Sequence, residues 1–362
     1  MAKKLSTDLT LLGVTLALLG FGLVMVWSAS SAFAQERHGS PYYFLVKQVA
    51  WAVIGLAAMA AALRLDYRVL RRPAVVYSVV AFATLSLIVV LFLPSVNETH
   101  RWVRFGGLSF QPAELAKLAI VLFLAYHVER RAERINEFVT LFPALLLLGW
   151  FGFLVFIQPD LGTAFTLVLT GAVMLYVAGV RLRYFAALAI PAAAVLYQAV
   201  MSVAWRRGRV LSFLDPWSDP RGAGYQIVQS LIAVGTGGLT GVGLMEGRQK
   251  LFYLPYPYSD FIFAVIGEEL GMIGALAVVL AFVVLLWRGL RAAWSAPDDF
   301  GRFLAAGLTL SIVLQAFINV SVTLGLLPTK GIPLPFISAG GSSLLFALIG
   351  IGLVLSVSQH AD

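Results

Sequence analysis

The residue of this 362-residue chain best placed to do chemistry is Asp260, which stands directly before the apolar run Phe261–Val265. It ends a basic, glycine-punctuated stretch, residues 204–260, within a chain that is otherwise mostly apolar. A carboxylate at the mouth of a membrane helix, next to so many cations, suits a site that handles an anionic, lipid-borne substrate. The stretch carries the cations Arg206, Arg207, Arg209, Arg221, Arg248 and Lys250.

Asp260 also has a purely structural interpretation. Aspartate accepts hydrogen bonds from the free N–H groups that begin a helix, so Asp260 could cap a helix starting at Phe261. Ser259 could supply the same cap. Capping and chemistry are compatible, because a cap also orients the carboxylate.

A second charged group lies in the predicted fourth membrane span, where Glu114 and Lys117 are three residues apart on one helix face. Each isolated charge inside a bilayer costs ~2.5–3.5 kcal/mol, so the two must face the bundle interior or a wet cavity. They are either functional or a neutral pair that locks helices together. Just upstream, Arg101 and Trp102 offer a planar donor and an aromatic face for phosphate or sugar, unless they are interfacial anchors.

Further candidates lie where turns and spans meet. Asp160 follows Pro159 and is predicted mainly to cap the sixth span. Lys330, in the proline-rich loop 328–338, would add a mobile cation for a phosphate. One residue of the pair Glu268 and Glu269 is expected to bind a basic partner.

The elements that must position these residues are membrane helices. The chain is 60% hydrophobic and 12% charged, with a mean hydropathy of +0.89, and a helix needs about 20 apolar residues to cross a bilayer. We therefore predict an all-α polytopic membrane protein, a single domain over residues 1–362 with about ten spans and a large extracytoplasmic loop, 204–260, between spans 7 and 8. The spans are expected near residues 9–29, 45–63, 74–93, 110–127, 140–157, 162–180, 184–203, 261–287, 302–325 and 342–358.

The long loop is not expected to be wholly irregular. Residues 224–234, which include Gln226, have helical character and would re-enter or lie along the membrane. The glycines of residues 235–238 predict a flexible break after them.

The formal charge of +8 follows the membrane topology and does not indicate nucleic acid. Basic residues gather in alternate inter-span segments, together with Lys3 and Lys4, so the positive-inside rule places both termini in the cytoplasm. The sequence has no phosphate-binding loop typical of ATP hydrolysis and no histidine spacing typical of a zinc site. Chemistry is therefore expected on the outer face, without a resident metal.

Taken together, these stretches resemble the SEDS family (shape, elongation, division and sporulation) over nearly the whole chain, and the division branch most. The chain departs from the family pattern at Tyr256 and Tyr258, where a glutamate and a histidine are usual. The motifs that carry the resemblance are Arg101-Trp102, Gln111-Pro112-Ala113-Glu114-Leu115-Ala116-Lys117, Gln158-Pro159-Asp160-Leu161-Gly162-Thr163, Phe213-Leu214-Asp215-Pro216-Trp217, Gly224-Tyr225-Gln226, Arg248-Gln249-Lys250, Asp260-Phe261-Ile262-Phe263-Ala264, Gly267-Glu268-Glu269-Leu270-Gly271 and Pro328-Thr329-Lys330-Gly331.

The resemblance implies a glycosyltransferase that polymerises lipid II into peptidoglycan, with inversion to a β-1,4 linkage, on the outer face of the bacterial cytoplasmic membrane. Asp260 would be the general base, and the loop cations would stabilise the departing pyrophosphate. A divalent cation, magnesium or manganese, could bridge that pyrophosphate. The candidate substrate-binding residues are Arg101, Trp102, Glu114, Lys117, Asp160, Arg209, Arg221, Gln226, Arg248, Lys250, Lys330 and Ser338.

The resemblance also implies partners and a location. A class B penicillin-binding protein would cross-link the nascent glycan strand, alongside other proteins of the division or elongation machinery. Membrane lipid would surround the bundle, a membrane-facing groove would admit the polyprenyl tail, and the division septum is the expected site of action.

Two other functions fit the same residues. A lipid II flippase would use Glu114, Lys117, Asp160 and Glu268 as a charged path through the membrane. A scaffold would recruit division proteins without doing chemistry. Transfer between leaflets without polymer would identify the flippase, and division that survives substitution of Asp260 would identify the scaffold.

Overall fold

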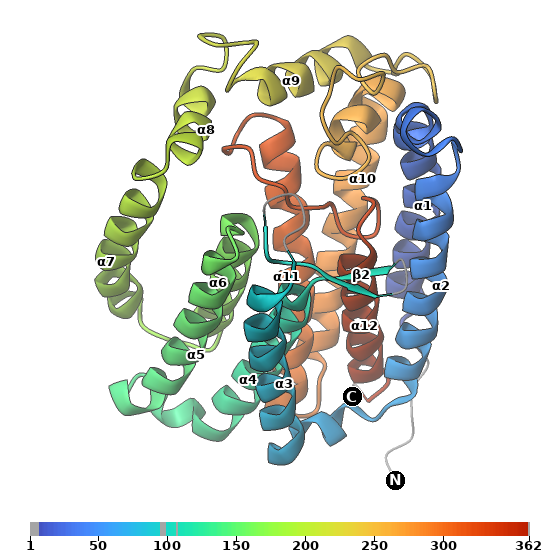
Figure 1. Ribbon diagram of the computed structural model, residues 1–362. Coiled ribbons are helices and arrows are strands. Elements are labelled where there is room, and N and C mark those ends of the chain that lie inside the picture. Colours follow the sequence, from blue (N-terminus) through green and yellow to red (C-terminus); the bar gives the residue numbers. More distant parts are fainter. Residues whose placement is uncertain (1–6, 95–98, 106–107, 361–362) are drawn as a thin grey trace.

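The computed structural model describes residues 7–94, 99–105 and 108–360, so Lys3 and Lys4 lie outside the described part of the chain. The described chain is almost entirely helical, with one short antiparallel hairpin (Figure 1). The helices are α1 (Leu9–His38), α2 (Tyr43–Arg64), α3 (Pro73–Val89), α4 (Pro112–Arg131), α5 (Phe138–Ile157), α6 (Leu161–Val177), α7 (Leu182–Met201), α8 (Ala204–Leu214), α9 (Tyr225–Gly237), α10 (Ile262–Trp294), α11 (Asp299–Thr323) and α12 (Gly341–Ser358). Short 3-10 turns are η1 (Tyr67–Arg71), η2 (Val90–Phe92) and η3 (Ala132–Arg134), and the hairpin pairs β1 (Val103–Phe105) with β2 (Leu108–Phe110).

Each predicted span coincides with one helix, from α1 to α7 and from α10 to α12. In the described ranges, seven helices have the length and hydropathy to cross a membrane, and two shorter apolar helices, Leu161–Val177 and Leu182–Gln198, fall below that length. The protein is therefore a multi-pass membrane protein. The number of ten crossings stays a prediction.

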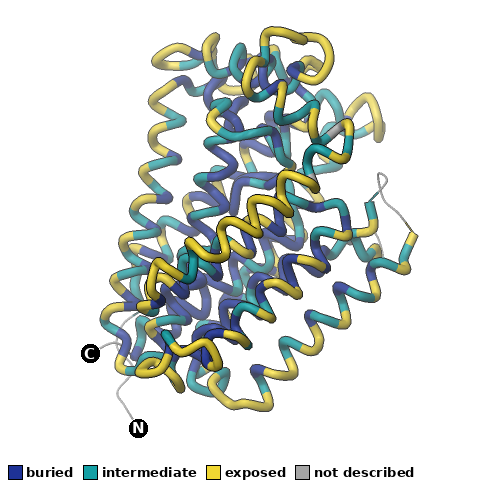
Figure 2. The backbone as a smooth tube through the Cα atoms, turned by 90° about the vertical axis from the view of Figure 1, so that its left-hand side faces the viewer, coloured by how far each residue is buried: buried dark blue, intermediate teal, exposed yellow. Residues whose placement is uncertain are grey.

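Helix α4 has 20 residues but is not one of these seven apolar helices, and its position explains why. It lies against α3, α6 and α11, and nearly all of its residues are buried within the protein. Figure 2 shows buried backbone concentrated in the middle of the bundle. A helix surrounded by protein need not be apolar towards lipid, so α4 can hold the buried pair of Glu114 and Lys117.

The long segment 204–260 contains two helices, as its sequence partly predicted. The helix expected at 224–234 is confirmed by α9, which lies across one end of the bundle against α10 (Figure 1). Helix α9 ends within the break expected at residues 235–238, at Gly237. A Cβ added at Gly237 would collide with the carbonyl oxygen of Gly267, so this glycine is present because two backbones meet there.

Helix α10 is broken near its first third, where Gly271 has φ 65° and ψ −164°. The segment after α9 takes over the hydrogen bonds that the break releases. Val242 N donates to Glu268 O at 3.0 Å, and Met272 N donates to Gly238 O at 2.9 Å. The short first part of α10 is thereby fixed to the 238–250 loop, and the residues just before it are held at the end of the bundle.

The two ends of the described chain lie together. Gln359 Nε2 donates to Thr7 Oγ1 at 2.8 Å, so α12 ends where α1 begins (Figure 1). This agrees with an even number of membrane crossings between them. In Figure 1 the helices of the long segment 204–260 lie at the end of the bundle away from these termini, and the β1–β2 hairpin crosses the middle of the bundle.

Candidate active site

A cavity of about 840 Å³ opens at the end of the bundle that carries α8 and α9. Its lining comes from six places in the sequence: the start of α2, the described residues of 99–111, residues 159–163 at the start of α6, α8 and α9, residues 256–261, and residues 330–343. Six of the predicted site residues lie in this lining, which are Arg101, Trp102, Arg209, Gln226, Asp260 and Lys330.

Asp260 enters the cavity because it is not used as a helix cap. Helix α10 begins at Ile262 with Phe261 at the N-cap, and no side chain of the described residues caps it, so the predicted capping role of Asp260 and Ser259 is wrong. The chain is instead anchored by Asn319 of α11, whose Nδ2 donates to Asp260 O at 2.8 Å and to Ile332 O at 2.7 Å.

Two further contacts set the place of the carboxylate. A Cβ added at Gly331 would lie 2.9 Å from Asp260 Oδ2, so the 330–340 loop passes close beside it. Ser338 Oγ donates to Ser259 O at 2.5 Å and accepts from Leu334 N at 2.8 Å. Ser338, predicted to bind substrate, therefore joins this loop to the segment that carries Asp260.

The surroundings of Asp260 tune its acidity. Burial raises the pKa of the carboxyl from 3.8 to about 6, against the opposing effect of the Arg101 and Arg209 cations. The same arginines stabilise the ionised form, and the negative charge of Asp160 disfavours it. A carboxylate whose pKa lies this close to neutrality can accept a proton and release it again.

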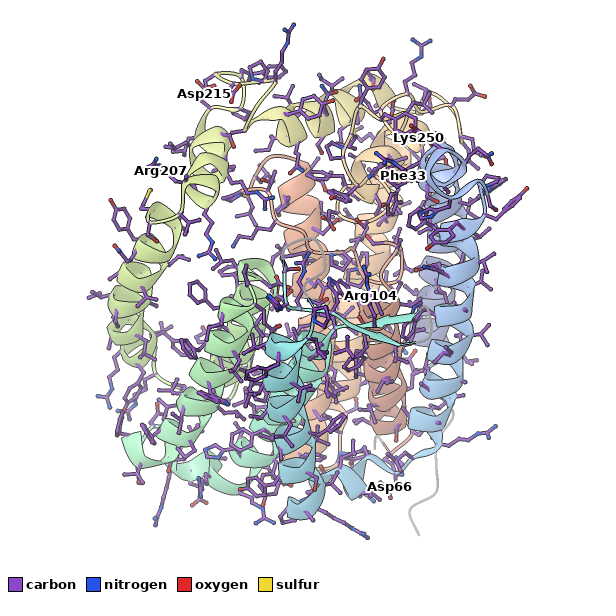
Figure 3. All side chains as sticks on the ribbon, viewed as in Figure 1. Phe33, Asp66, Arg104, Arg207, Asp215 and Lys250 are labelled. Atoms are coloured by element: carbon purple, nitrogen blue, oxygen red, sulfur yellow. The ribbon has the colours of Figure 1, made fainter. Side chains whose placement is uncertain are left out.

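Cationic side chains reach the cavity from separate elements. Arg101 precedes the hairpin, Arg104 lies in β1 (labelled in Figure 3), Arg209 in α8, and Lys330 in the loop before α12. The Lys330 ammonium, predicted as mobile, lies 5.0 Å from the centre of the Phe165 ring. Burial lowers the pKa of Lys330, and the charge of Asp160 partly offsets that effect.

Asp160 lies outside the cavity lining and holds two residues that belong to it, Gln111 and Arg101. Its Oδ1 accepts from Thr163 N at 3.0 Å, which confirms the predicted cap of α6. Its Oδ2 accepts from Gln111 Nε2 at 2.9 Å and lies 3.5 Å from Arg101 Nη1. Asp160 is 4% exposed, so it positions Arg101 and does not itself line the cavity.

The remaining predicted residues lie elsewhere. Glu114 and Lys117 form the predicted buried pair, with 2.7 Å between Oε2 and Nζ, and line a separate cavity of about 30 Å³ with Gln315. Arg221 and Arg248 are exposed and lie outside the lining of the large cavity.

Lys250 also lies away from the cavity. It is buried, and its Nζ lies 2.7 Å from Glu269 Oε1 and 3.0 Å from Ser28 Oγ. The prediction that one of the two glutamates binds a cation is thus confirmed for Glu269. Lys250 holds the 238–250 loop to α1 and α10, which leaves it no place in the large cavity.

Two residues that were not predicted from the sequence carry the site. Asn319 fixes Asp260, and Gln111 fixes Asp160. A signal for Asn319 was present, because Gln315, Asn319 and Thr323 recur every four residues within an apolar span. This spacing places three polar side chains on one face of α11.

A divalent cation would find few protein ligands here. Within the described ranges no group of three or more histidine, cysteine, aspartate or glutamate side chains could hold a metal ion. The carboxylate of Asp160 already accepts hydrogen bonds at both of its oxygens. Asp260 is the carboxylate left to contact a cation, which substrate phosphates would have to hold for the most part.

The fold and the cavity together define a polytopic membrane protein with an ionisable carboxylate in a cation-lined chamber at one end. The family model described as cell cycle protein (FtsW, RodA and SpoVE) matches residues 9–362, and the chain belongs to this family. A probable peptidoglycan glycosyltransferase FtsW from Geobacter metallireducens is 44% identical over 98% of this chain and 95% of its own length. Stage V sporulation protein E from Bacillus subtilis is 43% identical over 99% of each chain.

Solved structures agree with this assignment. A structure described as "Structural coordination of polymerization and crosslinking by a peptidoglycan synthase complex" superposes with a TM-score of 0.80 at 30% identity and covers 98% of each chain. The crystal structure of the rod shape determining protein RodA from Thermus thermophilus gives a TM-score of 0.71 at 27% identity, over 98% of this chain and 97% of that one. The resemblance to the SEDS family is confirmed.

Proposed function

We propose that this protein is a peptidoglycan glycosyltransferase that polymerises lipid II, with Asp260 as its general base. The observation that carries the proposal is the Asp260 carboxyl inside a chamber that Arg101, Arg209 and Lys330 also line. Relatives of nearly the same length are named probable peptidoglycan glycosyltransferases, which supports the reaction class.

In the proposed reaction the acceptor's 4-hydroxyl oxygen attacks the anomeric carbon of the donor sugar. The bond from that carbon to the pyrophosphate oxygen breaks, and the hydroxyl proton passes to an oxygen of Asp260. A single displacement inverts the configuration, from the α-linked donor to a β-1,4 product. A positioned base contributes typically 10²–10⁴-fold to such a step.

The leaving pyrophosphate carries the developing charge, and the cations are placed to meet it. Arg101 is held by Asp160, yet its buried Nε has no hydrogen-bond partner among the described residues. The Arg101 side chain also lines the chamber, so its guanidinium can donate to a phosphate oxygen. Arg209 approaches from α8 and Lys330 from the opposite loop, so the charge would be met by preorganised groups.

The membrane setting and the partners complete the proposal. The chamber would face the outside of the bacterial cytoplasmic membrane, with both termini in the cytoplasm, and the polyprenyl tail would lie between helices. A class B penicillin-binding protein would cross-link the new strand beside the bundle at the division septum. The structural neighbour described as a peptidoglycan synthase complex supports such a pairing.

The test is polymerisation of lipid II by the purified full-length protein with its penicillin-binding partner. Long glycan from the native protein and none from Asp260→Asn is the expected result. Asp299→Asn is the matched control, since Asp299 is 46% exposed and pairs with Arg302 at the other end of the bundle. Undiminished polymer from Asp260→Asn would overturn the assignment, and transfer of labelled lipid II between leaflets without polymer would identify a flippase.

A further inference from the structure

One side of the large cavity is aromatic. Tyr43, Tyr256 and Tyr258 line it, and we call these three residues the aromatic wall. The Tyr258 ring packs against Phe44 with 4.4 Å between ring centres and against Phe33 at 5.6 Å. These contacts join the loop before α10 to α1 and α2, so the wall is backed by a fixed cluster of rings.

The aromatic wall and the arginines of the cavity lining come from different elements. Figure 3 shows Phe33 on the α1–α2 side of the molecule and Arg207 of α8 on the opposite side. The cation Lys47 lies four residues after Tyr43 and binds to it. Its Nζ donates to the Tyr43 hydroxyl at 2.7 Å and lies 4.3 Å from the centre of that ring.

The charge of Asp260 acts on both the aromatic wall and the arginines. Burial and the charges of Tyr256 and Asp260 together raise the pKa of Tyr258 to about 12, so its hydroxyl stays neutral and can donate a hydrogen bond. A pyrophosphate beside the aromatic wall would face the Asp260 carboxylate without contact to Arg101 or Arg209, which line the cavity from other elements. A neutral sugar ring would meet no such repulsion, and it could lay its C–H face on an aromatic ring while its hydroxyls bond to the phenols.

We propose that the aromatic wall is the subsite for the acceptor sugar, the neutral ring whose hydroxyl is delivered to Asp260. This inference rests on the proposed function, because the donor's pyrophosphate is assigned to the arginine side and leaves the opposite side for the acceptor. Tyr256 and Tyr258 lie four and two residues before Asp260 on the same short loop. Ring contact with the sugar and proton transfer would therefore be fixed by one piece of backbone.

The backbone at Tyr256 supports a placed ring. Its φ of 53° lies in the left-handed region, which a bulky residue rarely adopts. Its carbonyl accepts from Ser259 N at 3.2 Å and from Phe261 N at 3.5 Å, closing the turn that leads to α10. A strained aromatic residue in a cavity lining is where a functional contact is expected.

Phe252 provides a matched control. It too has a positive φ, 67°, and it is 56% exposed where Tyr256 is 52% exposed, but it does not line the cavity. Asparagine tolerates the left-handed region, so Tyr256→Asn and Phe252→Asn each remove a ring with little strain on the backbone. Tyr258→Phe removes the hydroxyl and keeps the packing against Phe44, which guards against misfolding.

The experiment is binding of a lipid-free and phosphate-free β-1,4-linked tetrasaccharide of N-acetylglucosamine and N-acetylmuramic acid to the full-length protein, by calorimetry. We expect Tyr256→Asn to weaken binding about five- to tenfold. Tyr258→Phe should weaken binding less, and Phe252→Asn should bind as the native protein does. Polymerisation by Tyr256→Asn should show a raised KM for lipid II with kcat less affected.

The outcomes separate this inference from the proposed function. If Asp260→Asn makes no polymer yet binds the tetrasaccharide, and Tyr256→Asn loses that binding, both proposals stand. If the native protein makes no polymer but binding still depends on Tyr256, the polymerase falls and the saccharide subsite remains. If the native protein makes polymer, but Tyr256→Asn and Phe252→Asn have the same saccharide affinity and the same KM, the acceptor subsite is wrong and the proposed function stands.

Discussion

At the scale of single residues, the acidity of Asp260 sets the pH range in which the enzyme can work. Its pKa is raised from 3.8 to about 6 by burial, and only the ionised form accepts a proton. We predict that the polymerisation rate is constant above about pH 7 and falls about tenfold per pH unit below pH 6. The measurement is the rate from pH 5 to pH 8 with lipid II in excess.

A second variant tests whether the ionisation of Asp260 causes this pH dependence. Arg101 favours the charged carboxylate, so Arg101→Gln should move the midpoint to higher pH, besides lowering the rate. A rate that stays level down to pH 5 would show that the proton goes to another group.

Gly331 tests how closely the carboxylate must be placed. A methyl group there would lie 2.9 Å from Asp260 Oδ2, so Gly331→Ala must displace one of them. Displacements of about 1 Å can cost about 10² in rate, and we predict a loss of about ten- to a hundredfold in kcat. Gly235→Ala in α9 is the control, because its Cβ would meet nothing within 4 Å. Equal rates for the two variants would show that the site adapts.

At the scale of elements, the broken helix α10 depends on a buried ion pair. Glu269 is 0% exposed and is held by Lys250 and Ser28, while Met245 N donates to its Oε2 at 3.0 Å. Lys250→Met would leave this carboxylate buried without a cation, and removing one partner of such a pair costs about 3–5 kcal/mol. We predict a clearly lower unfolding temperature in detergent.

The control for this variant is the exposed pair at the other end of the molecule. Arg302→Met removes a cation that is 47% exposed and 2.9 Å from Asp299, and surface pairs contribute about 0–1 kcal/mol. The double variant Lys250→Met with Glu269→Gln should recover much of the lost stability. If Lys250→Met unfolds at the native temperature, the pair does not hold the 238–250 loop.

The same element shows what the sequence could and could not predict. Apolar runs located the helices α1 to α7 and α10 to α12, and i, i+3 spacing found the pair of Glu114 and Lys117. The break at Gly271 was not predicted, since it depends on backbone from residues 238–243 that fits into α10. Lys250 was wrongly expected near the substrate, because sequence shows that a cation is present and not which carboxylate it meets.

At the scale of the whole molecule, the cavity exists because segments far apart in the chain are tied to one another. The lining runs from Tyr43 to Ser343, and polar side chains of the bundle core hold its parts together. Gln315 Nε2 donates to Pro333 O at 2.9 Å, and Asn319 joins the segment of Asp260 to the 330–340 loop. Helix α11 therefore supports the segments that carry Asp260 and Lys330, whereas Arg101 is held by Asp160.

This division of support leads to the last prediction. Asn319→Leu removes both hydrogen bonds of Asn319 and frees Asp260 to shift, while Arg101 remains held by Asp160. We therefore predict that kcat falls about ten- to a hundredfold with a smaller rise in KM, because the base is misplaced and the loop of Lys330 loosened while Arg101 still binds the pyrophosphate. Thr309→Val is the matched control in α11, since Thr309 is buried and its hydroxyl has no hydrogen-bond partner among the described residues. If Asn319→Leu has the kinetics of the native protein, Gly331 and Ser338 suffice to hold the carboxylate. If KM rises while kcat is unchanged, α11 supports substrate binding and not proton transfer.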